Sequence, residues 1–140
     1  MFRTVTAFAL LVLAQPVAAY AATGCSGADP TIEDLAIKNV TTQAGLATYE
    51  VSGKVVNAGS ASQPSNVLQF VNIYLTGVKL DAKGVPPLKA GESYPFSYVY
   101  QRSVQAGTGS TKLDFQLGVT RPAQAASQNC FANGGDSITF

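Results

Sequence analysis

Apolar and polar residues alternate along most of the chain after about residue 30, and no segment there keeps a helical period. The clearest alternation lies in KLDFQLGVT, where apolar residues fall at every second position: Leu113, Phe115, Leu117 and Val119. Because successive side chains of a strand point to opposite faces, this pattern places one face of a strand in the core. The segment is therefore predicted to be a strand of a packed sheet.

Further segments read as strands between turn-rich connections: EDLAIKNV, LATYEVSGKVV, VLQFVNIYLTG, ESYPFSYVYQ and DSITF. Leu35 and Ile37 should share one face of the first. VLQFVNIYLTG is apolar at both parities, as expected of a strand buried on one face and partly covered on the other. Pro95 predicts an edge strand or a bulge. The spacing of turns predicts an all-β, immunoglobulin-like antiparallel β-sandwich of about seven strands.

A row of aromatic residues occupies alternate positions of ESYPFSYVYQ: Tyr94, Phe96, Tyr98 and Tyr100. Such a row, facing the apolar positions of KLDFQLGVT, is interpreted as core, with the Tyr hydroxyls reaching the rim. If Tyr74, Tyr98 or Tyr100 faced solvent, the row would instead favour a small carbohydrate-binding module. The chain has no Trp, the strongest stacking residue, which weakens that alternative.

The first 21 residues have the features of a secretory signal peptide. Arg3 precedes the apolar run AFALLVLA, and Ala19-Tyr20-Ala21 forms a small-x-small cleavage site. The run is too short to cross a membrane, which takes roughly 20 apolar residues. We therefore expect an N-terminal tail over residues 22–32, one domain over residues 33–140, and a periplasmic or extracellular location.

Charge excludes two classes of partner. The chain has 9 Lys and Arg against 8 Asp and Glu, a formal charge of +1, and the charges are scattered singly. No basic stripe is present to bind nucleic acid. No polybasic cluster is present to bind anionic lipid. A protein partner is expected instead.

Several short motifs give the chain a resemblance to a known family. VVNAGSA, VPPLKAGES, the IYLTG strand and the closing QNCFANGGDSITF resemble the CARDB domain, the cell adhesion related domain found in bacteria. The resemblance runs from about Glu33 to Phe140. It implies an immunoglobulin-like fold and a binding or spacer module, related to adhesion, rather than a catalyst. One departure is the connection RPAQAASQNCFANGGD, where family members often carry several acidic residues and this chain has only Asp136.

The only two cysteines, Cys25 and Cys130, lie near opposite ends of the mature chain. No CxxC motif and no His are present, so a zinc or redox site is not expected. We predict a disulfide formed after export, stabilising by about 4–5 kcal/mol in the chain-entropy model. The alternative is lipidation of Cys25 within ATGC, a weak lipobox, which would leave Cys130 unpaired.

Catalysis finds little support in the residues. Without His, neither a Ser-His-Asp nor a Cys-His arrangement can form. No cofactor or metal site is predicted. A hydrolase would require two carboxylates that converge in a cleft. The eight candidates fall mostly singly along the chain: Asp29, Glu33, Asp34, Glu50, Asp81, Glu92, Asp114 and Asp136.

The favoured function is a secreted, non-catalytic binding or scaffold module that contacts a protein partner through loops. Loops carry binding residues more often than the strands that hold them. Two polar, turn-rich segments, residues 57–66 and 82–91, are expected at one end of the sandwich. The candidate contact residues in them are Asn57, Gly59, Gln63, Asn66, Lys83 and Lys89.

Overall fold

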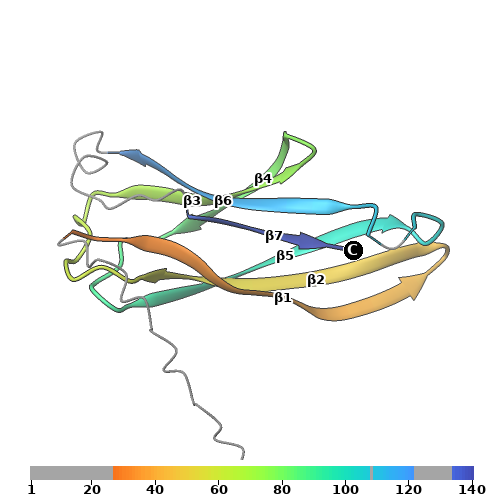
Figure 1. Cartoon of the computed structure of the whole chain (residues 1–140), viewed down its shortest axis with the longest axis horizontal. Coiled ribbons are helices and arrows are strands. Elements are labelled where there is room, and N and C mark those ends of the chain that lie inside the picture. The colour runs from red at the N-terminus through yellow and green to blue at the C-terminus, as the bar shows by residue number, and fades with distance from the viewer. Residues whose placement is uncertain (1–26, 108, 122–133) are drawn as a thin grey trace, which may run out of the picture.

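The computed structural model describes residues 27–107, 109–121 and 134–140, which form two antiparallel sheets packed face to face (Figure 1). One sheet has the order β1-β2-β5 and the other the order β4-β3-β6-β7. This arrangement confirms the predicted immunoglobulin-like sandwich. The strands are β1 Pro30–Gln43, β2 Leu46–Asn57, β3 Leu68–Leu75, β4 Val78–Val85, β5 Ser93–Ser103, β6 Lys112–Arg121 and β7 Gly135–Thr139.

The core lies between the inner faces of the two sheets and follows the predicted alternation. On β6, Leu113 and Phe115 are fully buried, and on β3 Val71 and Ile73 are equally enclosed. The outer residues of β3 are half-buried or exposed, as expected from its apolar composition at both parities. The complete core cluster is Ile32, Val51, Val55, Val71, Ile73, Val85, Leu88, Phe96, Leu113, Phe115 and Phe140.

The aromatic row of β5 is core for three of its four members. Phe96 is buried, and Tyr98 and Tyr100 pack against the core cluster, whereas Tyr94 is 39% exposed. A Cβ at Gly53 would lie 2.7 Å from the Phe96 ring, so the Phe96 ring occupies the space above this glycine. β5 is an outer strand of its sheet, which confirms the edge position that Pro95 predicted.

β4 was not among the predicted strands, and its discovery corrects a predicted loop. Residues 82–85, expected in a loop over residues 82–91, belong to this strand. A two-residue turn makes the β3–β4 hairpin, with Thr76 at φ 49° and Gly77 at φ 82°. A two-residue turn with positive φ at both residues matches the right-handed twist of the flanking strands. Sequence alternation did not reveal β4 because its inward positions include the charged Asp81 and Lys83.

β1 also departs from expectation. It begins at Pro30, and both Pro30 and Ile32 are buried, so part of the expected tail belongs to the sandwich. Register shifts interrupt its pairing with β2, and Asp34 has φ 55° at the first of them. Leu35 packs against the core as predicted, whereas Ile37 remains 37% exposed on this edge strand.

The connections gather at two ends of the sandwich (Figure 1). We call one the loop end; it comprises residues 27–29, 58–67 and 86–92. We call the other the hairpin end; it comprises the turns at 44–45 and 76–77 and the described part of the 104–111 connection. Within the described ranges, no helix has the length and apolar character needed to cross a membrane.

Candidate functional site

The loop end is organised around the side chain of Asn57, the last residue of β2. This side chain is fully buried. Its Oδ1 accepts hydrogen bonds from the backbone N–H groups of Asp29 (2.8 Å) and Gly59 (3.2 Å). Its Nδ2 donates to the carbonyls of Ala61 (2.9 Å) and Leu88 (3.2 Å). One amide therefore ties together the N-terminal segment, the β2–β3 connection and the β4–β5 connection.

A second buried amide pair lies beside it. Gln63 and Gln69 exchange reciprocal hydrogen bonds, at 2.9 Å and 2.8 Å between nitrogen and oxygen. Gln69 also donates to the Pro86 carbonyl, and Gln63 accepts from the Leu88 N–H, both at 2.9 Å. Because their amides are fully engaged, these polar groups can be buried without an unsatisfied atom. The two pairs of contacts fix the path of residues 86–88.

Sequence reasoning missed Gln69, although a signal for it was present. Gln69 occupies an inward position of β3, on the same face of the strand as the fully buried Val71 and Ile73. A lone amide among buried aliphatic side chains requires a polar partner inside the protein. Gln63, six residues earlier, is that partner.

Three of the predicted contact residues need correction. Asn57 and Gln63 are buried, at 0% and 7% exposure, so their side chains do not reach a partner. Both amides instead satisfy backbone groups where strands end. Lys83 lies within β4 rather than in a loop, and it forms an ion pair with Asp81 at 2.8 Å.

Gly59 plays a packing role in this end of the molecule. A Cβ on Gly59 would lie 2.1 Å from the Gly27 carbonyl oxygen and 2.6 Å from the Asp29 nitrogen. The N-terminal segment therefore crosses directly over this glycine, and any side chain would displace it. Asn66 and Lys89, in contrast, are exposed as predicted.

Five of the exposed residues of the two longer connections form what we call the loop-end surface: Pro64, Ser65 and Asn66 of the β2–β3 connection with Lys89 and Ala90 of the β4–β5 connection. The Glu92 carboxylate accepts a hydrogen bond from the Lys89 N–H at 2.8 Å, which closes the second turn. The buried amides hold both connections to the sheets from within. Small polar loops on such a fixed base are typical of binding surfaces.

Charged groups of the edge strand β4 form a separate cluster away from this surface. The Lys83 ammonium and the Ala82 N–H hydrogen-bond the Asp81 carboxylate and lower its pKa below the ordinary value. Lys83 also lies 5.8 Å from the centroid of the Tyr98 ring. Burial, with the nearby Asp81 charge, raises the pKa of the Tyr98 phenol.

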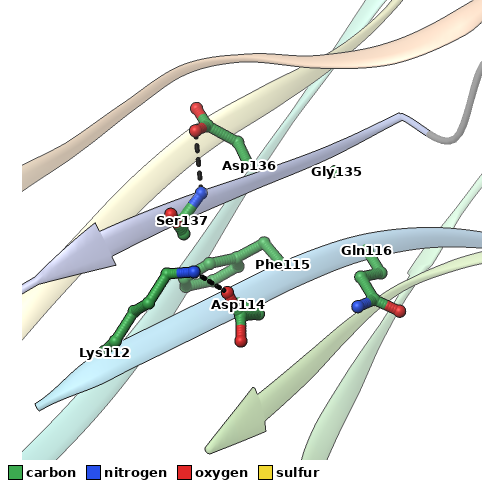
Figure 2. A pocket seen from close by; sticks show the side chains of 7 residues that line it. All are labelled: Lys112, Asp114, Phe115, Gln116, Gly135, Asp136 and Ser137. Carbon is green, nitrogen blue, oxygen red and sulfur yellow. Dashed lines mark hydrogen bonds and ion pairs between the residues drawn. The ribbon is translucent and has the colours of Figure 1, made fainter. Parts of the chain in front are cut away.

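Two carboxylates, Asp114 and Asp136, line one shallow groove of about 290 Å³ along β6 and β7 (Figure 2). Asp114 is paired with Lys112 at 2.9 Å. In the β6–β7 register Asp136 lies opposite Phe115 and Asp114 lies opposite Ser137. Cross-strand partners share a face, so the two carboxylates point to opposite faces of the sheet, as Figure 2 shows. They do not form the convergent pair that a hydrolase needs.

The carbohydrate alternative retains little support. Tyr98 and Tyr100, two of the three tyrosines on which it depended, pack against the core. Tyr74 alternates with the buried Ile73 on β3, which places its ring on the outer face of the sheet, half-buried. A single half-covered ring does not make a stacking platform.

Neither cysteine can be placed. Cys25, Cys130, the expected signal peptide and most of the connection before β7 lie outside the described residues. The disulfide and the alternative of lipidation at Cys25 therefore stay predictions. Among the residues that the structure does describe, no three His, Cys, Asp or Glu side chains come together.

Comparison with known proteins bears on the fold. No protein-family model and no curated protein matches the sequence. A solved structure does: the CARDB domain of a Pyrococcus furiosus protein in complex with di-metal ions. The two share 19% sequence identity and superpose with a TM-score of 0.51, over 81% of this chain and 92% of that one. The chain has the fold of a CARDB domain. The predicted resemblance is confirmed at that level.

Proposed function

We propose that this protein is an exported, non-catalytic immunoglobulin-like module that binds a protein partner through its loop-end surface. The observation that carries the proposal is the set of buried amides, Asn57, Gln63 and Gln69, beneath two exposed connections. Loops that are fixed before binding lose little conformational entropy when they meet a partner. The fold shared with a CARDB domain supports an adhesion-related scaffold role.

Metal binding is not part of the proposed function. The solved CARDB domain holds di-metal ions. Here four of the described carboxylates are ion-paired with lysines: Asp34 and Glu33 with Lys54 at 2.9 Å and 3.7 Å, and Asp81 and Asp114 with lysines on their own strands. A lysine at a carboxylate supplies the counter-charge that a cation would supply. These paired carboxylates are therefore neutralised without a metal cation, and among the described residues no three His, Cys, Asp or Glu side chains come together.

Site-specific photo-crosslinking of the exported protein in its host tests the loop-end surface. A photoreactive amino acid at Asn66 should give one discrete adduct with a protein. The same group at Thr76, an exposed residue of the hairpin end, is the matched control and should give none. Lys89→Glu should weaken the Asn66 adduct. Equal adducts from both positions, or no adduct from Asn66, would contradict the proposal.

Export itself has a separate readout. The intact mass of the secreted protein should correspond to a chain that begins at Ala22 or Thr23. Alkylation of Cys25 and Cys130 should occur only after reduction. A mass that instead shows acyl chains on an N-terminal Cys25 would replace the soluble module with a membrane-anchored one.

A further inference from the structure

The two sheets differ in strand number, and the surplus strand is β4. A three-stranded sheet faces a four-stranded one. At one side of the sandwich β1 lies beside β7, where a Cβ on Gly134 would come within 3.2 Å of the Pro30 carbonyl. At the other side a groove of about 370 Å³ separates β4 from β5. Its lining residues are Ala82, Lys83 and Gly84 of β4 and Tyr94, Pro95, Phe96 and Ser97 of β5.

The hydrogen-bonding parity of β5 can be read from the two ends of its ladder with β2. The register runs over eleven pairs without a bulge. At one end the Asn57 N–H donates to the Glu92 carbonyl at 2.9 Å, and at the other the Val104 N–H donates to the Gly45 carbonyl at 3.0 Å. On the β5 side both bonds involve even-numbered residues, Glu92 and Val104. Even-numbered residues of β5 therefore bond to β2, and odd-numbered ones point away.

The odd-numbered residues of β5 thus present a row of backbone groups to the free edge, which borders the groove at Ser97 and continues beyond it. Ser97, Val99 and Gln101 direct their N–H and C=O groups to the free edge. Pro95 fits the same parity, because it has no N–H to give to β2. Among the described residues, no turn or loop group bonds to the backbone of Ser97, Val99 or Gln101.

The other three edges are protected, whereas on β5 the comparable device is Pro95, which lies near the start of the strand. β1 carries register shifts, β4 carries lysines and a register shift beside it, and β7 has only five residues. Such devices prevent strands from adding to a sheet. Between Phe96 and Gln101, β5 has no proline, no charge and no bulge. An unguarded edge of this length is unusual for a protein that meets no partner there.

The one lysine of the groove is neutralised by an ion pair, and both strands beside the groove carry exposed apolar residues. Lys83 and Asp81 neutralise each other at 2.8 Å. Val78 of β4 shares the inner face of Leu75, its cross-strand partner, yet is 63% exposed. Val99 of β5 is 58% exposed, on the outer face of its sheet, because the adjacent Tyr98 and Tyr100 point into the core. A strand placed beside β5 would lie under β4 and cover Val78, and its outward side chains would lie beside Val99. It would need no charge at its inward positions.

We propose that the groove between β4 and β5 binds an extended, uncharged segment of a partner protein, which adds to the three-stranded sheet as a fourth strand. The backbone of Ser97, Val99 and Gln101 would pair with it, and alternate apolar side chains would pack beneath β4. A second folded copy does not fit, because its own four-stranded sheet would occupy the space that β4 already fills. This surface is separate from the loop end and does not depend on it.

Binding of a defined probe to the purified chain tests this proposal. The probe is a fluorescent peptide of about ten alternating Val and Thr residues, a strand-forming length. Fluorescence anisotropy should show saturable binding, and hydrogen exchange should slow at Ser97, Val99 and Gln101. Val99→Pro removes one outward N–H and should weaken binding by at least about tenfold. Val99→Thr, which keeps the N–H and the side-chain shape, is the matched control and should bind like the wild type.

A second probe keeps the test valid if Val99→Pro does not fold. The same peptide with N-methyl groups on alternate residues cannot complete a ladder and should not bind the wild-type chain. The proposal is wrong if the unmodified peptide fails to bind at millimolar concentration, or if both peptides bind equally. It is also overturned if Val99→Pro, correctly folded, binds as well as Val99→Thr. Concentration-dependent dimers that the peptide dissociates would identify a second copy as the occupant and reject the partner segment.

Discussion

The two ends of the sandwich satisfy the same need by different means. At both ends, strands stop and leave backbone groups that require hydrogen-bond partners. The loop end uses buried side-chain amides that reach across 28 and 31 residues of sequence, from Asn57 to Asp29 and Leu88. The hairpin end uses local backbone geometry, with positive φ at Ala44-Gly45 and Thr76-Gly77. The two longer connections of the loop end therefore sit over a specific polar network, and the two-residue turns need none.

The hairpin end has one long-range feature, the connection between β5 and β6. The Arg102 guanidinium donates to the Tyr49 hydroxyl at 3.2 Å and to the Gly107 carbonyl at 3.2 Å, and lies 5.4 Å from the centroid of the Tyr49 ring. Phe140 closes the core beside it, with its ring 4.4 Å from that of Tyr49 and 5.6 Å from that of Tyr100 between centroids. Here packing and a half-exposed cation take the place of buried amides.

The difference teaches where sequence change is tolerated. A network of buried amides fails as a unit, because each lost amide leaves several buried partners unsatisfied. A two-residue turn affects only the hydrogen-bonding groups of its own backbone. Substitutions of the buried amides at the loop end should therefore destabilise the protein, whereas substitutions of its exposed residues should be tolerated. This is the pattern expected of a scaffold that presents variable contacts.

The largest effect should come from Asn57→Ala. The substitution leaves the N–H groups of Asp29 and Gly59 and the Ala61 carbonyl without this partner, whereas the Leu88 carbonyl keeps its bond from the Gln63 N–H. We therefore expect the free energy of unfolding to fall by about 3 kcal/mol. Urea unfolding with a constant m-value measures it. Asn66→Ala, an exposed asparagine of the same end, is the control and should change stability by less than about 0.5 kcal/mol. Equal effects of the two substitutions would show that the amide network does not hold the loop end.

An intermediate effect is expected from Arg102→Met at the hairpin end. Methionine keeps the apolar stem but loses the hydrogen bonds and the stacking on Tyr49, at a cost of about 1–2 kcal/mol. Lys89→Met removes a cation from the exposed loop-end surface and should cost less than about 0.5 kcal/mol. If Arg102→Met matched Asn57→Ala, the contrast between the two ends would be wrong.

Much of this fold was predictable because one face of each central strand is buried. Period-two alternation identified β2, β5 and β6, a run that is apolar at both parities identified β3, and Pro95 correctly marked β5 as an edge. β4 escaped prediction because it pairs only with β3 and has no strand opposite it, so Asp81 and Lys83 can occupy inward positions. Apolar and polar residues alternate along a strand when one of its faces is buried, and β4 is buried too little to show this pattern.

The candidate site was predicted only in part, since its chemistry depends on distant contacts. Asn57 in the turn-like stretch NAGS reads as a loop residue, and nothing local separates an exposed turn asparagine from a buried one. Its position is decided by the N-terminal segment that crosses over Gly59. Sequence reasoning therefore located the loop end correctly but assigned its buried scaffold to its surface. Asn66 and Lys89 are the predicted residues that remain available for contact.

The smallest effect, and opposite in sign, should come from Ala44→Asn in the β1–β2 turn. Ala44 has φ 50°, a conformation that costs an ordinary side chain about 1–2 kcal/mol and that asparagine adopts more readily. We expect a gain of about 0.5–1 kcal/mol in the free energy of unfolding, because an Asn-Gly pair suits this two-residue turn. Ala90→Asn at the loop end, where φ is not positive, is the matched control and should be neutral. A gain at Ala44 with no effect at Ala90 would show that the hairpin end is governed by local backbone geometry, whereas a loss at Ala44 would mean that distant contacts govern this turn as well.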